Sequence, residues 1–455
     1  MINETIKNIY VYLSLSNKDH FVGTLGIIND AEDKQHSTFE YSDEWLNSDI
    51  AFPISVEMPL SKQVFTSKEQ MFPIFYMQAF LYPVDFYFEY LLIYLKKHNL
   101  LSKAEDFDSQ ELYKWLQNAD CYTGKFGQKN DYLKFLTTQN SMLYLNDFTR
   151  IGAFRFKSDK NGDFLQNMED KKLLTVDEID KLFEIMQKIN NNSETAEELE
   201  LFHACSSSLK GRKPKANLLD KDGNLCIAKI SSLTDEDKNF LLTEIFALNV
   251  AKKFGINVQE YSVEKTKDGK EYLLLKRFDR QGKKRLHFAN LDSVEGYIDY
   301  EDDKLIAKTI TKFCKKNATK NLREFFRRKL FRSAITNTKA FLPNIGFLFD
   351  EETGWNLSPE YDTTVGFLHY DAFDYIKTHE KNEILLTATD YNQLMENAHH
   401  YRVSHKQAKK MVKELKKILV NYKEDALKIG FAEEDICKIR IYLKAFDKIK
   451  YSYKK

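Results

Sequence analysis

The sequence predicts an α+β protein in which a β-rich unit is followed by a strand-and-helix unit and then by a mainly helical unit. Three observations support this fold class: apolar residues alternate near the N-terminus, strand and helix patterns succeed one another in the middle of the chain, and helical spacing dominates after residue 278. At 455 residues the chain is long for a single hydrophobic core. We therefore expect three domains, at residues 1–195, 196–277 and 278–455.

The first predicted domain opens with strands and ends with helices. Apolar residues alternate over residues 9–25 and close on Gly23-Thr24-Leu25-Gly26, which predicts a strand pair with a turn. The polar run at residues 190–194 is the best candidate linker to the next domain. The other predicted elements are strands at residues 39–41 and 150–156, a capped turn at 43–46, and a helix at 176–189.

Strands, turns and one helix make up the second predicted domain. Asp220-Lys221-Asp222-Gly223 predicts the turn of a hairpin. Residues 235–254 place apolar side chains on one stripe and end at Gly255, a residue type that readily adopts the left-handed conformation after a helix. The remaining predicted elements are hairpin strands at residues 217–219 and 225–230, strands at 258–263 and 272–275, and, in the third domain, helices at 321–336 and over 391–445.

Charge and cysteine content exclude several classes of protein. The chain has 68 basic and 68 acidic residues, so no excess positive charge favours direct nucleic-acid binding. Its five cysteines are scattered without metal-ligand spacing, which indicates a reducing cytoplasm. The N-terminus lacks the pattern of a secretory signal, and prolines and acidic residues interrupt the apolar stretch at 71–94. We predict a cytoplasmic protein without a membrane span.

Two loops in the third domain carry the clearest functional pattern. The first is Asn337-Thr338-Lys339-Ala340-Phe341-Leu342-Pro343-Asn344, and the second, after a short apolar strand, is Ser358-Pro359-Glu360-Tyr361-Asp362. Oxygen atoms of Asn344 and Asp362 suit a hard cation such as magnesium. The two loops resemble the metal-handling loops of a protein kinase, which positions a nucleotide, holds magnesium and accepts the proton of the attacking hydroxyl. Lys339 stands where that base is expected.

Several further strings occur in an order and at spacings that are hard to obtain by chance. They lie at residues 39–45, 150–156, 206–216, 227–229, 277–280, 346–348 and 354–362, together with Glu244. The set resembles the HipA-like serine/threonine kinases, the toxin component of bacterial HipBA-type toxin-antitoxin systems. The resemblance spans most of the chain. It implies a bilobal protein-kinase-like (HipA-like) fold with ATP and magnesium (Mg) as cofactors.

The resemblance also implies the residues of a nucleotide site. Lys229, on the second hairpin strand, would reach the α- and β-phosphates, and Glu244 on the following helix would hold its ammonium group. Lys276 and Phe278 would line the adenine pocket. Without the resemblance, Lys229 is interpreted as a surface lysine, Glu244 as a solvated helix residue, and the string at 277–280 as a cluster of ion pairs.

The basic turn at residues 209–215 resembles the phosphate-covering loop of the family. Lys210, Gly211 and Lys215 are its candidate phosphate contacts, through positive charge and flexible backbone. The turn has one glycine, which limits how closely its backbone can approach a phosphate, and the alternative interpretation is a solvent-exposed basic turn. Ser208 falls at the position of a serine that is autophosphorylated in the family.

The first loop departs from the family pattern. Family members have Asp, His and a basic residue where this chain has Lys339, Phe341 and Pro343. A lysine with an ordinary pKa of about 10 stays charged beside a triphosphate and does not accept a proton, and loss of a general base costs about 10²–10⁴-fold in rate. We therefore expect a pseudokinase-like protein that binds ATP and in which phosphoryl transfer to protein serine or threonine is impaired or lost.

Two alternatives stay open. In one, the chain is an active protein-serine kinase toxin with a relocated base, for which Asp279, Asp350 and Asp371 are candidates. In the other, it is a non-enzymatic interaction or decoy protein that retains only the fold. The resemblance implies a small helix-turn-helix antitoxin as partner, a protein substrate in the translation machinery, and contact with DNA only through the partner.

Overall fold

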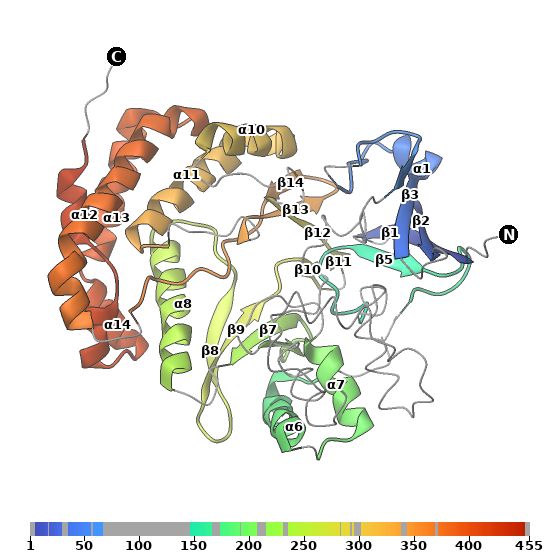
Figure 1. Cartoon of the computed structure of the whole chain (residues 1–455), viewed down its shortest axis with the longest axis horizontal. Helices are drawn as coiled ribbons and strands as arrows, with labels where there is room; N and C mark the ends of the chain where they lie inside the picture. The colour runs from blue at the N-terminus through green and yellow to red at the C-terminus, as the bar shows by residue number, and fades with distance from the viewer. Residues whose placement is uncertain are drawn as a thin grey trace. The chain divides into compact units, whose positions relative to one another are not determined.

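The described residues of the computed structural model form both sheets and helices, which confirms the α+β class (Figure 1). The chain divides into two compact units: unit 1 comprises Met1–Ile230 and Tyr261–Ala289, and unit 2 comprises Ser231–Glu260 and Asn290–Lys455. These units group the chain differently from the three predicted domains, whose boundaries stay a prediction. The structure describes residues 5–16, 18–29, 35–55, 58–66, 146–165, 173–191, 193–206, 215–230, 235–282, 284–291, 294, 302–337, 344–368 and 372–450.

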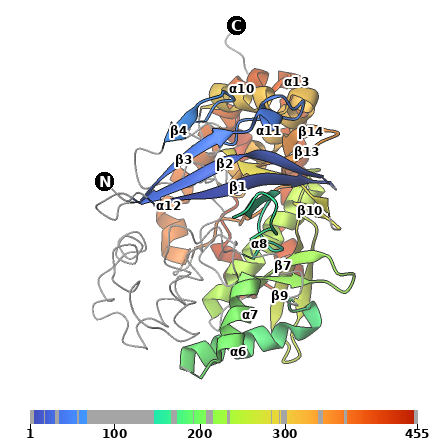
Figure 2. The same ribbon diagram turned by 90° about the vertical axis from the view of Figure 1, so that its right-hand side faces the viewer.

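Unit 1 contains a five-stranded antiparallel sheet with the strand order β4-β3-β2-β1-β5. Figure 2 shows β3, β2 and β1 side by side. Ile9, Val11 and Leu13 are buried at alternate positions of β1, as a strand with one covered face requires. The strands are β1 (Thr5–Leu15), β2 (Lys18–Asn29), β3 (Gln35–Tyr41), β4 (Val64–Thr66) and β5 (Phe154–Lys157).

The predicted strand pair is confirmed, but its predicted turn is wrong. Residues 23–26 lie inside β2, whereas β1 ends at Leu15 and is followed by Ser16 with a φ of 49°. A Cβ atom at Gly23 would lie 2.3 Å from the carbonyl oxygen of Glu40 on β3. This glycine therefore allows two strands to approach closely. The predicted capped turn is confirmed as α1 (Asp43–Leu46), where the Ser42 side chain accepts a hydrogen bond from the backbone of Trp45.

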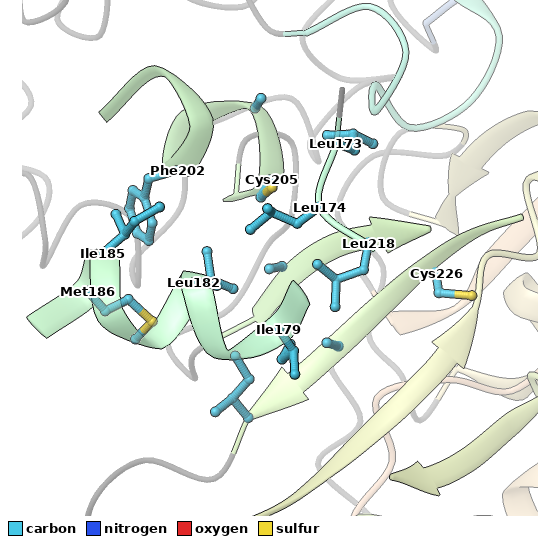
Figure 3. Close-up of a cluster of buried hydrophobic side chains, with 14 of the residues drawn as sticks. Leu173, Leu174, Ile179, Leu182, Ile185, Met186, Phe202, Cys205, Leu218 and Cys226 are labelled. Carbon is cyan, nitrogen blue, oxygen red and sulfur yellow. The ribbon is translucent and has the colours of Figure 1, made fainter. Parts of the chain in front are cut away.

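A second antiparallel sheet of unit 1 has the order β6-β7-β9-β8 and packs against two helices (Figure 3). Ala216, Leu218, Cys226 and Ala228 alternate along β6 and β7 and join the buried cluster that includes Leu182. The predicted hairpin and the helix before it are thus confirmed. The elements are η3 (Val176–Glu178), α6 (Ile179–Asn191), α7 (Ala196–Ser206), β6 (Lys215–Leu219), β7 (Leu225–Ile230), β8 (Tyr261–Lys265), β9 (Glu271–Lys276), β10 (Arg280–Gln281) and β11 (Lys284–Arg285).

Unit 2 is mainly helical in its described part. The predicted helix at 235–254 is confirmed as α8, and Gly255 follows it with a φ of 74°. The chain passes from unit 1 to unit 2 at β12 (His287–Asn290). The described elements of unit 2 are α8 (Asp235–Lys253), α10 (Asp303–Phe313), η4 (Lys315–Asn317), α11 (Ala318–Ala334), β13 (Gly346–Asp350), β14 (Gly354–Leu357), α12 (Ala372–Asn397), η6 (Ala398–Tyr401), α13 (His405–Leu419), α14 (Tyr422–Ile429), η7 (Glu433–Lys438) and η8 (Leu443–Lys448).

One buried ion pair fastens these helices to one another. Lys329 Nζ on α11 lies 2.5 Å from Asp303 Oδ1 on α10, and the Tyr401 hydroxyl donates to the same oxygen at 2.5 Å. The amide of Asn397 donates to Asp303 Oδ2 at 2.8 Å. Both carboxylate oxygens are satisfied, so this cluster is structural. Among the helices that the structure describes, none is long and apolar enough to cross a membrane.

Candidate functional site

The hairpin of β13 and β14 brings the two predicted loops together within unit 2. Its strands are antiparallel, so the segment before β13 and the segment after β14 lie side by side. Asn344 Nδ2 lies 3.3 Å from Asp362 Oδ2. The side-chain amide of Asn337 donates to the carbonyl oxygen of Thr364 at 2.7 Å. Both residues that flank the segment 338–343 therefore contact the loop that carries Asp362.

Asp362 presents its carboxylate at the surface of unit 2. The residue is exposed, and its φ of 52° lies in the left-handed region that aspartate tolerates better than most residues. Among the described residues, no group of three or more His, Cys, Asp and Glu side chains forms a metal cage. One carboxylate beside one amide nevertheless fits magnesium, which keeps several waters and takes other ligands from phosphates. Burial, reinforced by the Asp362 charge, raises the pKa of Tyr361 well above its ordinary value.

Glu360 holds the loop of Asp362 in place through buried contacts. Its carboxylate accepts hydrogen bonds from Arg332 Nε at 2.8 Å and from the Thr363 hydroxyl at 2.8 Å, and Arg328 Nη1 lies 3.4 Å from its other oxygen. Glu360 and both arginines are at most 4% exposed. The carboxylate two residues before Asp362 thus pairs with two buried guanidinium groups, and Glu324 supplies Arg328 with a second counter-charge.

The sequence carries one signal of the pairing between Glu360 and the arginines of α11. Arg328 and Arg332 are four residues apart, so they share one face of α11 with apolar neighbours. Arginines on the covered face of a helix require acidic partners. The partner, Glu360, lies 28 residues after Arg332, and no local pattern connects the two.

In unit 1, the structure brings together two of the predicted phosphate contacts. Lys215 on β6 and Lys229 on β7 are direct cross-strand partners, so their side chains project from the same face of the sheet. The residue next to each lysine in its strand is an alanine, Ala216 in β6 and Ala228 in β7. Both alanines belong to the buried core that packs against α6 and α7. The lysines therefore lie on the opposite face from those helices. Two lysines on the same face of neighbouring strands are a cationic feature that suits a polyphosphate, although the side chain of Lys215 is buried.

The other predicted nucleotide contacts that the structure describes are placed each within its own unit. Glu244 is buried on α8 in unit 2, whereas Lys229 belongs to unit 1, so their pairing stays a prediction. Lys276 ends β9, and the Phe278 ring lies 5.8 Å from the Phe288 ring. Four of the predicted site residues lie outside the described part of the chain: Ser208, Lys210, Gly211 and Lys339.

Comparison with known families decides which family this arrangement belongs to. The HipA-like C-terminal domain matches residues 207–422, and the HipA N-terminal domain matches residues 14–80. The chain is a HipA-like protein. The first match includes Lys215, Lys229, Asn344 and Asp362, so the paired loops and the two lysines lie within the family's own domain. No curated protein matches the sequence.

A solved structure has a fold similar to that of this HipA-like protein. HipA of the Shewanella oneidensis MR-1 toxin-antitoxin system, solved with HipB and operator DNA, covers 96% of this chain over 95% of its own, with a TM-score of 0.52 and 15% identity. The proinflammatory kinase CtkA of Helicobacter pylori covers 52% of this chain over 88% of its own, with a TM-score of 0.36 and 14% identity. The kinase-like (HipA-like) fold predicted from the sequence is confirmed by the first similarity.

The structure argues against Asp279 as a relocated base. Its carboxylate is 4% exposed and accepts hydrogen bonds from Arg277 Nε at 2.8 Å, Arg280 Nη1 at 2.7 Å and the backbone of Gly152 at 2.8 Å. Burial opposes ionisation, but the Arg277 and Arg280 charges and these hydrogen bonds hold the pKa of Asp279 far below its ordinary value. Such a carboxylate is a weak proton acceptor. The interpretation of residues 277–280 as ion pairs holds within unit 1.

The remaining candidate bases differ in what the structure says of them. Asp350 ends β13 and its Oδ1 accepts backbone hydrogen bonds from Glu352 at 3.0 Å and Thr353 at 3.2 Å, so its carboxylate stabilises the turn of the hairpin. Asp371 lies outside the described residues. An active kinase with a relocated base therefore has less support than the sequence alone gave it.

Gly366, in the segment after Asp362, lies against Thr336, which follows α11. Substitution of Gly366 is a first test of this packing. A Cβ atom there would lie 2.1 Å from Thr336 Oγ1, and that hydroxyl is held by the carbonyl oxygen of Arg440 at 2.9 Å. We expect Gly366→Ala to destabilise the protein by about 1–3 kcal/mol through overpacking. The denaturant midpoint measures the loss. Thr336→Gly in the same chain removes the opposing hydroxyl and should recover part of it, whereas strictly additive effects would contradict the contact.

Proposed function

We propose that this HipA-like protein binds ATP through magnesium and transfers its phosphate slowly or not at all, as a pseudokinase of toxin-antitoxin type. The observation that carries the proposal is the juxtaposition of Asn344 with the exposed carboxylate of Asp362. Magnesium, when bound, bridges phosphate oxygens and neutralises their charge. Asp362 and Asn344 would hold the metal, and Lys215 and Lys229 would contact phosphates.

The second part of the proposal concerns the proton. Phosphoryl transfer depends mostly on positioning and charge neutralisation, so a fold can keep ATP binding after it loses the base. Lys339 supplies an ammonium group at the position of that base. We infer that it pairs with the γ-phosphate, which strengthens nucleotide binding and obstructs the hydroxyl acceptor.

Thermal stabilisation tests the binding step. A ligand that binds only the native state at 100 times its Kd stabilises it by about 2.7 kcal/mol. We expect ATP with magnesium to raise the Tm and ATP with a chelator to raise it much less. Asp362→Ala should abolish the magnesium-dependent part of the rise in Tm. Glu352→Ala removes an exposed charge from the turn between β13 and β14 and should retain that rise.

The outcomes separate the alternatives. No response of the wild-type Tm to ATP and magnesium would overturn the proposal and leave a non-enzymatic interaction protein as the better hypothesis. Transfer of labelled phosphate by the wild-type chain to a lysate protein, lost in Asp362→Ala, would establish the active kinase toxin instead.

We further propose a partner and a location for the protein. Shewanella HipA was solved with HipB and operator DNA, and it shares this fold. We infer that this chain also pairs with a small helix-turn-helix antitoxin and meets DNA only through it, in the cytoplasm. A translation component is the proposed class of protein substrate. The balanced charge, with 68 basic and 68 acidic residues, supports the indirect route to DNA. Direct binding of isolated chain to duplex DNA at about 0.15 M salt would contradict it.

A further inference from the structure

Arg332 contacts both of the loops that form the site. It lies in the last turn of α11 and is 3% exposed. Its backbone carbonyl accepts the N–H of Asn337 at 2.9 Å, which fixes the start of the first loop. Its guanidinium group binds Glu360 of the second loop, with Nη2 2.6 Å and Nε 2.8 Å from the same carboxylate oxygen. One side chain and its own backbone thus join two segments that are distant in sequence.

Glu360 in turn fixes the backbone on the N-terminal side of Asp362. Its N–H donates to the carbonyl oxygen of Asn257 at 2.7 Å, and its carbonyl oxygen accepts from the N–H of Gln259 at 3.2 Å. The peptide groups of Glu360 are therefore held independently of its carboxylate. The residue cannot shift without breaking contacts on both its backbone and its side chain.

Thr363 fixes the backbone on the other side. It is 1% exposed, and its hydroxyl donates to Glu360 Oε1 at 2.8 Å, across the position of Asp362. Asp362 is thus enclosed between two anchored residues. Its left-handed φ of 52° is unfavourable for a residue other than glycine and persists only where neighbouring contacts enforce it.

The carboxylates around the two arginines differ in burial. Arg328 also pairs with Glu324, its Nε lying 3.0 Å from Oε1, so the two arginines have Glu324 and Glu360 as counter-charges. Asp362 is the exposed carboxylate of this loop. Glu324 and Glu360 supply the counter-charges of the two arginines, and the carboxylate of Asp362, beside Asn344, lies at the surface.

From these contacts we infer that Arg332 and Glu360 form a positioning pair that holds Asp362 in its metal-binding conformation and ties it to the loop that begins at Asn337. The inference rests on the proposed function. It assigns to the pair an effect on metal affinity, since groups that orient a metal ligand typically change that affinity about 10- to 100-fold when they are altered. The affinity of the nucleotide at saturating metal should change little.

Manganese provides the test, because free Mn²⁺ gives an electron paramagnetic resonance signal that disappears on binding. The full chain is titrated with MnCl₂ at a fixed concentration of a non-hydrolysable ATP analogue. For Glu360→Gln and for Arg332→Lys we expect the half-saturating Mn²⁺ concentration to rise about 10- to 100-fold. Glu352→Gln, an exposed change in the turn between β13 and β14, should leave it unchanged.

A milder pair of variants keeps the test informative if a buried charge change prevents folding. Thr363→Val removes the hydroxyl that reaches Glu360 and should raise the half-saturating Mn²⁺ concentration, and Thr363→Ser should restore it. If folded variants bind Mn²⁺ as the wild type does, the positioning role is wrong and the proposed function stands. If the wild type binds no Mn²⁺ with the nucleotide, the proposed function itself fails.

Discussion

Replacing Lys339 by Asp together with Phe341 by His is expected to raise phosphate transfer by about 10²–10⁴-fold, the factor that a positioned general base contributes. The double change restores the two family residues that bear most directly on the proton of the attacking hydroxyl. The structure supports the expectation because the residues that flank this segment, Asn337 and Asn344, contact the Asp362 loop. A carboxylate returned to position 339 would then act on a site whose proposed metal ligands, Asn344 and Asp362, lie beside each other.

Incorporation of γ-labelled phosphate into the protein and into a cell lysate measures this gain. Lys339→Ala with Phe341→His is the matched control, since it removes the ammonium group and supplies no base. Asp362→Ala added to the restored chain should abolish transfer. If the alanine control is as active as the aspartate variant, the lysine acts by obstruction alone, and the argument from a missing base is wrong.

The sequence predicts those helices and strands that are determined by residues close together in the chain. The hairpin of β6 and β7, the helix α8 with Gly255 after it, and the β13 strand all follow from alternation, helical spacing and turn residues. Gly23 shows the limit of that reasoning. The glycine pattern predicts a turn there, whereas the structure places Gly23 inside β2, where a Cβ atom would collide with the carbonyl oxygen of Glu40 on β3.

The resemblance predicts Asn344 and Asp362 as metal ligands because the order of the family's strings is a property of the sequence. The structure places the two side chains beside each other, and their role as ligands stays a prediction. The contacts that hold their loops could not be predicted from the sequence. The pairing of Arg332 with Glu360 depends on α11 packing against a loop 28 residues later, which is a tertiary contact. Element ends were also misplaced where neighbours decide them: β8 begins at Tyr261, and Val258 before it forms a bridge with Glu360.

Asp279→Asn is expected to destabilise the protein by about 3–5 kcal/mol, the cost of removing one partner from a buried ion pair. The carboxylate accepts hydrogen bonds from Arg277, Arg280 and Gly152, and both arginine side chains are at most 7% exposed. The same guanidinium groups donate to backbone carbonyl oxygens, including that of Thr149 at 2.6 Å. Loss of the negative charge leaves two buried cations uncompensated beside that backbone.

The pH dependence of stability gives the same carboxylate a second test. The pKa of Asp279 is lowered in the folded protein, so the unfolded chain binds the proton more readily. The stabilisation is complete above the ordinary aspartate pKa of about 3.9 and is lost as the pH falls further, towards the folded value. The wild-type denaturant midpoint should therefore fall in acid more steeply than that of Asp279→Asn.

Asp222→Asn is the matched control for both measurements, because Asp222 is an exposed residue in the hairpin turn of the same unit. Exposed substitutions of this kind change stability by about 0.5 kcal/mol or less. Equal midpoint shifts for the two variants at neutral pH would show that the arginines find other counter-charges. A large loss confined to Asp279→Asn would establish that this carboxylate holds the end of β9 against the loop around Gly152, which makes it a structural group and removes it from the candidates for the catalytic base.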